Sequence, residues 1–148
     1  ASRGNLTPPG IAPGASIIPV KVLDRRNVGW FTDWAAGIEY AVSLHQEDNG
    51  ISIDVINMSL ETDSQYAGHC DGVSRAFSSA CEAARSRGIS VLTCGGNIGS
   101  TTRLTLPGCF ASTTAVASVW DTLPATISSP NYPDINLIRS TSDPNFPL

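Results

Sequence analysis

The fold of this chain is decided by one stretch, Ile89-Ser90-Val91-Leu92-Thr93-Cys94-Gly95-Gly96-Asn97-Ile98-Gly99-Ser100. An apolar, β-prone run bounded by glycines is typical of a strand buried on both faces of a parallel sheet. Asn97 then lies at the carboxyl end of that strand, where open α/β sheets bind their ligands. An asparagine amide there can donate hydrogen bonds to a negatively charged oxygen. It can also simply tolerate a left-handed turn, and the local sequence leaves both interpretations open.

Length and composition indicate one compact domain. The chain has 148 residues, of which 41% are hydrophobic and 15% are charged, which argues against disorder. The formal net charge is −4, so the sequence offers no basic surface for nucleic acid. No apolar stretch of about 18 residues predicts a membrane span, and residues 1–4 do not open a signal peptide. We expect an internal piece of a longer chain, because neither end resembles the natural terminus of a domain.

Hydrophobic periodicity predicts strands that alternate with helices. The expected strands cover residues 15–23, 53–60, 89–94 and 114–119, and the expected helices cover residues 31–46 and 73–87. Helices between successive strands predict a partial doubly wound parallel sheet in a three-layer α/β/α arrangement. Beyond residue 120 prolines interrupt the pattern, and no regular structure is expected there.

Polar residues and glycines mark the ends of the two helices. Thr32 or Asp33 is available as the N-cap of the first helix. His45 closes its apolar stripe, and we favour a structural role for this histidine over a catalytic one. Gly88 is placed to end the second helix in a left-handed conformation.

The cysteines bear on metal binding and on the cellular compartment. Cys70, Cys81, Cys94 and Cys109 show no C-x-x-C spacing, which argues against a zinc site. One or two disulfides would suit an oxidising compartment, and Asn5-Leu6-Thr7 is a glycosylation sequon. We therefore expect a protein of the extracellular space or the secretory pathway, without a metal site.

Several separated segments carry a family resemblance. They are Gly10-Ile11-Ala12-Pro13-Gly14-Ala15, Val20-Lys21-Val22-Leu23, Gly37-Ile38-Glu39-Tyr40-Ala41, Asp54-Val55-Ile56-Asn57-Met58-Ser59-Leu60, Cys94-Gly95-Gly96-Asn97-Ile98-Gly99 and Ala115-Val116-Ala117-Ser118-Val119. In this order and spacing they resemble the catalytic domain of the subtilisin-like serine proteases (subtilases, the peptidase S8 family). We expect residues 1–120 to form a partial peptidase domain, and residues 121–148 to form an irregular, proline-rich tail that does not match the family.

The resemblance implies a role for each matching segment. Asn97 would donate to the oxyanion of the tetrahedral intermediate in acyl transfer. The substrate backbone would lie between two edges, Val28-Gly29-Trp30 and Ser59-Leu60-Glu61, with Phe31 lining a hydrophobic pocket. Cys94-Gly95-Gly96 would form one wall of the main specificity pocket.

Two of these positions depart from the family pattern. Glu61 replaces the usual glycine, and its side chain could crowd the substrate strand or recruit a basic residue. Cys94 replaces the usual alanine and would be a pocket-wall thiol. The resemblance also implies a disulfide between Cys70 and Cys109, with Cys81 as a small buried side chain. It implies no cofactor; calcium occurs in the family, but no calcium site is identifiable in this sequence.

The family's catalytic motifs are absent from the sequence. Its aspartate lies in Asp-Ser/Thr-Gly, its histidine in His-Gly-Thr and its serine in Gly-Thr-Ser-Met-Ala, and none of these occurs. His45 and His69 lack the following Gly-Thr, and Ser142 lacks the glycine and methionine neighbours. A triad needs all three groups within hydrogen-bonding reach, so we expect the chain alone to be inactive.

The resemblance also implies a gap in the sheet. In the family, the strand with the catalytic aspartate lies between the strands that resemble residues 15–23 and 53–60, and that strand is missing here. Each buried backbone group without a partner costs about 1–3 kcal/mol. We therefore expect residues 15–23 to pair directly with residues 53–60 or to be loosely held.

Three functions fit these observations. The first is an internal portion of a subtilisin-like serine endopeptidase that binds the remaining segments of the protease domain and an extended peptide or protein substrate. The second is a catalytically dead, subtilase-derived module that binds peptides or proteins. The third is a small α/β domain whose glycine loop binds phosphate. The third is the weakest, because a phosphate loop opens into a helix N-terminus and Ser100-Thr101-Thr102 is not a helix start.

Overall fold

A computed structural model describes residues 11–45, 50–100 and 102–117. The elements in chain order are α1 (Phe31–Leu44), β1 (Val55–Met58), β2 (Gln65–Tyr66), the short 3-10 helix η2 (Asp71–Val73), α2 (Arg75–Ser86), β3 (Ser90–Cys94), β4 (Leu104–Thr105) and β5 (Thr114–Val116). The expected tail, the domain boundary at residue 120 and the sequon at Asn5 lie outside the described residues.

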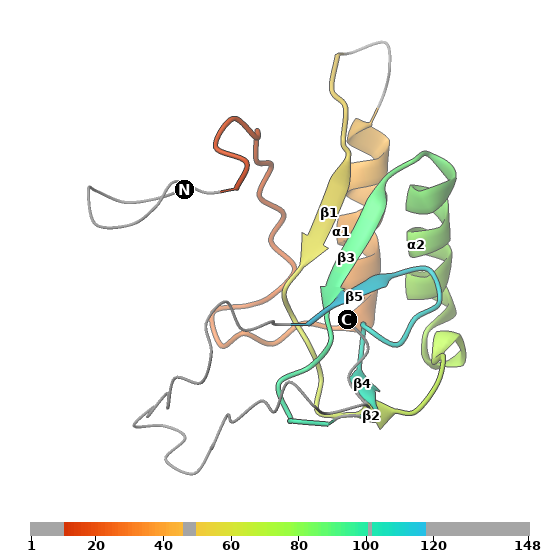
Figure 1. The fold of residues 1–148 in the computed structure, drawn as a ribbon. Coiled ribbons are helices and arrows are strands. Elements are labelled where there is room, and N and C mark those ends of the chain that lie inside the picture. The colour runs from red at the N-terminus through yellow and green to blue at the C-terminus, as the bar shows by residue number, and fades with distance from the viewer. Residues whose placement is uncertain (1–10, 46–49, 101, 118–148) are drawn as a thin grey trace, which may run out of the picture.

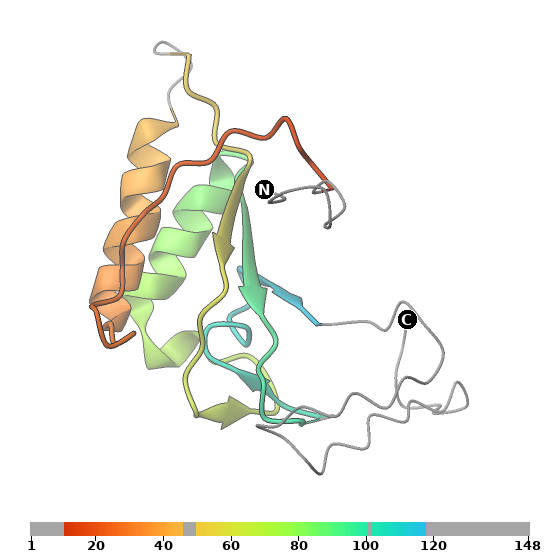
Figure 2. The ribbon, with the colours of Figure 1, turned by 90° about the vertical axis from the view of Figure 1, so that its left-hand side faces the viewer.

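The three longer strands form a parallel sheet in the order β1-β3-β5. Met58 of β1 pairs with Thr93 of β3, and Leu92 of β3 pairs with Thr114 of β5. The predicted partial α/β fold is confirmed. Both helices cover the same face of the sheet (Figures 1 and 2). The described residues therefore form two layers, and a second helix layer is not found among them.

Helix α1 buries the apolar stripe that its sequence predicts, and its buried residues are Trp34, Ala35, Ile38 and Ala41. Its N-cap is Trp30 rather than the predicted Thr32 or Asp33. The reason is that the Asp33 carboxylate reaches back to accept a hydrogen bond from the Trp30 backbone N–H, at 3.1 Å, as acidic residues at the third helical position do. Neither described helix is long and apolar enough to span a membrane.

His45 at the end of α1 and Gly88 after α2 have the structural roles that the sequence predicts. Nδ1 of His45 accepts a hydrogen bond from the Ile53 backbone N–H at 3.0 Å, so His45 holds the chain that leads into β1. Helix α2 starts at Ser74, whose Oγ accepts from the Phe77 N–H at 3.3 Å. It is followed by Gly88, with φ at +78°, a conformation that glycine adopts without a steric cost.

Aromatic rings join the helices to the loop that follows β4. The ring of Phe31 lies 4.7 Å from that of Trp34, and the ring of Phe77 lies 4.7 Å from that of Phe110, measured between centroids. The tilted and edge-on arrangements are those that aromatic pairs prefer. Phe77 is completely buried, so this cluster is the centre of the core.

Residues 15–23 do not form a strand, so the prediction of a first strand and of its direct pairing with residues 53–60 is wrong. Pro19 has no N–H for a ladder, and no strand among the described residues pairs with the segment. The segment instead runs along α1, where a Cβ on Gly37 would lie 2.6 Å from Val22 Cγ1. Ile17 is 81% exposed, whereas Val22 packs against the core. Only the end of the segment is therefore anchored.

The sequence does not predict the small antiparallel sheet of β2 and β4. Gln65 pairs with Thr105 and Tyr66 with Leu104, and each strand is only two residues long. Such short strands carry no measurable periodicity. This sheet returns the chain after Asn97 to the loop that follows β1.

A disulfide lies next to this small sheet. The structure joins Cys70 to Cys109, the pair that the family resemblance implies, with their Cα atoms 5.5 Å apart. The Cys70 N–H also donates to the Cys109 carbonyl at 3.1 Å. Cys81 is free and completely buried. Burial raises its pKa to about 12, so this thiol is chemically inert.

We expect the disulfide to make a large contribution to stability. The bridged residues are 39 positions apart, and closing a loop of that length stabilises a folded chain by roughly 3–4 kcal/mol. Replacing both Cys70 and Cys109 by alanine should lower the free energy of unfolding by this amount, measured by urea denaturation. The Cys94→Ala variant is the control for loss of a cysteine that is not in a disulfide; it loses only the hydrogen bond to the Leu60 carbonyl and should cost much less stability. Unchanged stability of the double variant would contradict the prediction.

We expect Trp34 to stabilise the fold by its volume and not by its N–H group. The side chain is 4% exposed, and its Nε1 has no hydrogen-bond partner in the described structure. Trp34→Phe should therefore cost only about 1 kcal/mol, whereas Trp34→Ala should cost about 3–5 kcal/mol because it leaves a large cavity. The two variants are compared by urea denaturation. Equal losses for both would show that the indole N–H matters after all.

Candidate functional site

The loops after β1 and β3 both leave the sheet at the carboxyl ends of its strands. Because Met58 is level with Thr93, the residues that follow each strand lie next to one another. The Cys94 thiol donates to the Leu60 carbonyl oxygen at 3.1 Å. The parallel register therefore brings together the predicted substrate edge at residues 59–61 and the predicted pocket wall at residues 94–96.

Asn97 is held by Glu61. The Asn97 backbone N–H donates to Glu61 Oε2 at 2.9 Å, and the Asn97 side-chain Nδ2 donates to Glu61 Oε1. A third donor, the Thr105 hydroxyl, reaches Oε2 at 3.2 Å. Asn97 is exposed and Glu61 is half-buried. Both residues stand out in the sequence, but their contact does not follow from it.

Gly96 makes this contact possible. Its φ is +115°, a conformation that residues with a Cβ rarely adopt. A Cβ at this position would lie 2.8 Å from the Thr105 side chain. The absence of a side chain therefore lets the loop lie against β4, with the Asn97 amide directed at Glu61.

The environment of Cys94 favours the protonated thiol. Burial raises its pKa above the usual value, and the nearby charge of Glu61 raises it further. The reactive form of cysteine is the thiolate, so Cys94 is a poor nucleophile here. Its place in a pocket wall stays a prediction.

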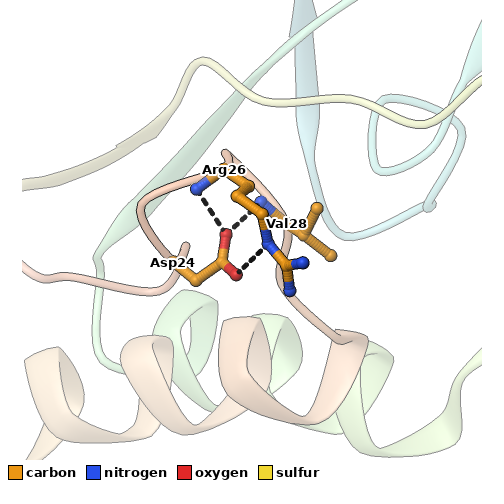
Figure 3. Close-up of polar contacts among 3 residues, drawn as sticks. All are labelled: Asp24, Arg26 and Val28. Atoms are coloured by element: carbon orange, nitrogen blue, oxygen red, sulfur yellow. Dashed lines mark hydrogen bonds and ion pairs between the residues drawn. The ribbon is translucent and has the colours of Figure 1, made fainter.

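The other predicted edge, Val28-Gly29-Trp30, follows a turn that Asp24 holds (Figure 3). Asp24 Oδ1 accepts from the backbone N–H groups of Arg26 and Val28, at 2.8 and 3.0 Å. Asp24 Oδ2 accepts from the Arg26 guanidinium at 3.3 Å. Val28 is 54% exposed and Trp30 is 75% exposed, so the turn presents an accessible edge.

The ring of Phe31, which the resemblance places in a substrate pocket, contacts other aromatic rings of the protein. Its half-buried ring packs against Trp34, Phe77 and Phe110, so it belongs mainly to the core. Its role in a substrate pocket stays a prediction. In the described ranges, no group of three or more histidine, cysteine, aspartate or glutamate side chains is arranged to hold a metal ion.

An open groove of about 650 Å³ lies beside β1. Its lining comes from the segment at residues 15–22, from α1 and from the whole of β1, and Figure 1 shows that segment on the side of β1 away from β3. The Ser90 N–H donates to the Asp54 carbonyl at 2.9 Å. Since ladder groups alternate along a strand, the backbone groups of Val55 and Asn57 face the groove. This edge of β1 has no partner strand among the described residues.

The chain matches the family that its motifs resemble. Residues 2–141 match the model of the subtilase family, Peptidase S8. The chain belongs to the subtilase family. The matched range continues past residue 120, where the resemblance drawn from individual motifs ends.

Known proteins show how much of a subtilase this chain covers. It is 38% identical over 113 residues to subtilisin E of Bacillus subtilis (strain 168), a match that covers 74% of this chain and 26% of that protein. It is 34% identical over 99 residues to subtilisin-like protease 10 of Trichophyton verrucosum (strain HKI 0517), covering 67% of this chain and 17% of that protein. The chain therefore spans about a quarter of subtilisin E.

Solved structures agree with the sequence comparison. The structure is similar to that of Sphericase, with a TM-score of 0.62 and 28% identity, and the match covers 76% of this chain and 34% of that one. The S41 Psychrophilic Protease gives a TM-score of 0.61 at 28% identity, covering 78% of this chain and 34% of that one. The partial sheet is thus the sheet of a subtilisin-like fold.

We expect the turn at Asp24 to weaken in acid. Hydrogen bonds from the backbone N–H groups of Val28 and then Arg26 lower the pKa of Asp24 from its usual 3.8. A lowered folded-state pKa means that the carboxylate stabilises the fold above its unfolded pKa, and that this contribution is lost as the pH falls through the folded pKa. In an NMR titration, the Asp24 carboxyl and the amides of Arg26 and Val28 should share a midpoint below 3.8. A midpoint at or above that value would contradict the hydrogen-bonded turn.

Proposed function

We propose that this chain is part of a subtilisin-like serine endopeptidase, and that the remaining segments of the protease domain supply the catalytic triad. The observation that carries this proposal is the unpaired lateral edge of β1 beside an open groove. At its carboxyl end β1 leads to Glu61, which contacts Asn97. The substrates are extended peptides or proteins. A location outside the cytosol fits the disulfide between Cys70 and Cys109.

In this proposal the groove receives a strand. Neighbouring strands lie about 4.8 Å apart, so an inserted strand would reach the backbone groups of Val55 and Asn57 directly. It would also cover apolar side chains of the groove lining, which include Ile18, Val20, Ile56 and Met58. Pairing and burial together favour a segment of the same domain as the occupant.

Asn97 is the chemical contribution of this chain. Its side-chain nitrogen carries two hydrogens, and the structure directs one of them at Glu61. The second is available for the oxyanion that forms when a serine attacks the substrate carbonyl. One such donor typically accounts for a factor of about 10²–10³ in turnover.

The nucleophile and the base must come from elsewhere. His45 already accepts a hydrogen bond from the Ile53 N–H, so its Nδ1 is occupied by the backbone that leads into β1. The Cys94 thiol donates to the Leu60 carbonyl and is held in its protonated form. The catalytically dead binding module uses the same groove and edges, and differs only in the absence of turnover.

We expect the purified chain to cleave no fluorogenic peptide on its own. Co-expression with the segments that flank it in its reading frame should produce cleavage that a serine-directed fluorophosphonate abolishes. In that assembly Asn97→Ala should lower kcat by about 10²–10³ with little change in KM, because the amide acts on the transition state. Inhibitor-sensitive cleavage by the chain alone would overturn the proposal, and peptide binding without turnover in the assembly would favour the binding module.

A matched pair of groove variants tests the inserted strand. Asn57→Pro removes a backbone N–H that faces the groove, whereas Asn57→Ala keeps it. The proline variant should assemble with the flanking segments at least about tenfold more weakly than the alanine variant, the effect of losing one buried hydrogen bond or more. Circular dichroism checks that both variants keep the fold. Equal assembly of the two would exclude pairing at this edge.

A further inference from the structure

The side chain of Glu61 reaches from one of the segments that would flank a substrate side chain to the loop of the other, where it accepts from Asn97. We propose that its carboxylate selects a basic substrate residue by binding the guanidinium or ammonium group of an arginine or lysine next to the scissile bond. This inference rests on the proposed protease function. It assigns that site a substrate class through a residue that departs from the family pattern.

The geometry places the carboxylate between the segment after β1 and the segment after β3. Glu61 follows Leu60, whose carbonyl accepts from the Cys94 thiol at 3.1 Å, so the base of the side chain is held next to one wall. The carboxylate reaches the opposite loop, where it accepts from the Asn97 backbone N–H at 2.9 Å. A side chain that enters between the two segments therefore meets a carboxylate.

The charge of Glu61 is not neutralised within the described structure. The ion pair found there joins Arg26 to Asp24, and the donors to Glu61 are the neutral groups of Asn97 and Thr105. Oε2 receives two of these donors and Oε1 receives one. A carboxylate offers about four acceptor positions, so Oε1 keeps one for a further donor.

Each class of substrate side chain meets this carboxylate differently. A guanidinium or ammonium group adds a charge-assisted hydrogen bond to a half-buried anion. An apolar side chain would remove water from the anion without replacing its hydrogen bonds. An acidic side chain would be repelled. The site therefore discriminates by charge.

A bound cation would also act on Asn97. The Asn97 Nδ2 donates to Glu61 Oε1, the oxygen that keeps a free acceptor position. A cation at Oε1 competes for that oxygen and offsets the negative charge beside the developing oxyanion. A basic substrate residue should therefore raise kcat as well as lower KM, whereas a purely structural role for Glu61 would not depend on the substrate side chain.

The first test compares peptides that differ at one residue. The assembled protease is given substrates with arginine, citrulline, leucine or glutamate before the cleaved bond; citrulline is the neutral isostere of arginine. We expect kcat/KM for arginine to exceed that for citrulline by roughly ten- to a hundredfold, the range for one charge-assisted pair. Glu61→Gln should abolish this ratio, and Glu61→Asp should restore part of it. Glu82→Gln, on an exposed position of α2, is the control for net charge.

The outcomes separate this inference from the proposed function. Cleavage with the same arginine-to-citrulline ratio in the wild type and in Glu61→Gln would overturn the role of Glu61 and leave the protease function intact. An assembly that cleaves no peptide at all would overturn the protease function. In that case the second test decides the inference alone.

The second test measures binding without turnover. The isotope-labelled chain of 148 residues is titrated with acetyl-arginine amide and, separately, with acetyl-citrulline amide. We expect the arginine probe to shift the backbone and side-chain amide signals of Asn97 in a saturable way that weakens at high salt. The citrulline probe, and the arginine probe with Glu61→Gln, should produce no such shift. Equal shifts with both probes would overturn the inference.

Discussion

The parallel pairing of β1 with β3 is the constraint on which the site depends. Met58 and Thr93 are paired and buried on the helix side of the sheet. A slip of one residue would turn each side chain of β1 to the opposite face. Met58 would then leave the core, and Glu61 would no longer reach the Asn97 loop. The packing of the core and the geometry of the site are therefore fixed by the same register.

A second set of contacts holds the far side of the site. Thr105 pairs with Gln65, donates its hydroxyl to Glu61 and accepts through its backbone carbonyl from the Cys109 N–H at 3.2 Å. Cys109 is in turn bonded to Cys70 at the start of the α2 region. The Glu61 carboxylate is thus connected, through one buried threonine, to the covalent bridge and to the helical layer. We therefore expect removal of the disulfide to change the position of Thr105 and with it the hydrogen bond from Thr105 to Glu61.

Sequence reasoning predicts the elements that have a period long enough to measure. The apolar stripe of α1, the amphipathic α2 and the strands β1 and β3 follow from such periods, with ends that differ by a few residues. The same reasoning fails for residues 15–23, whose composition suits a strand. A segment becomes a strand only when it pairs with a neighbouring strand. The composition of a segment does not show whether such a neighbour is present.

The site is predictable only in part, for a similar reason. Family motifs identify Asn97, and the unusual residue at position 61 is visible in the sequence itself. The hydrogen bonds between them join residues 36 positions apart. These bonds exist because the two loops leave the sheet at the carboxyl ends of neighbouring strands. The left-handed Gly96 that allows the approach is equally hidden, since two successive glycines fit many loop conformations.

The outer strands of the sheet also affect the chain's behaviour in solution. Val55 on β1 and Val116 on β5 are 50% and 53% exposed, and no described strand covers the outer edge of either. Bare apolar edges are templates on which other chains add as further strands. On its own, the chain should therefore lose solubility as its concentration rises, by edge-to-edge aggregation. Expression at low temperature and low concentration, or together with its neighbouring segments, is the physical remedy.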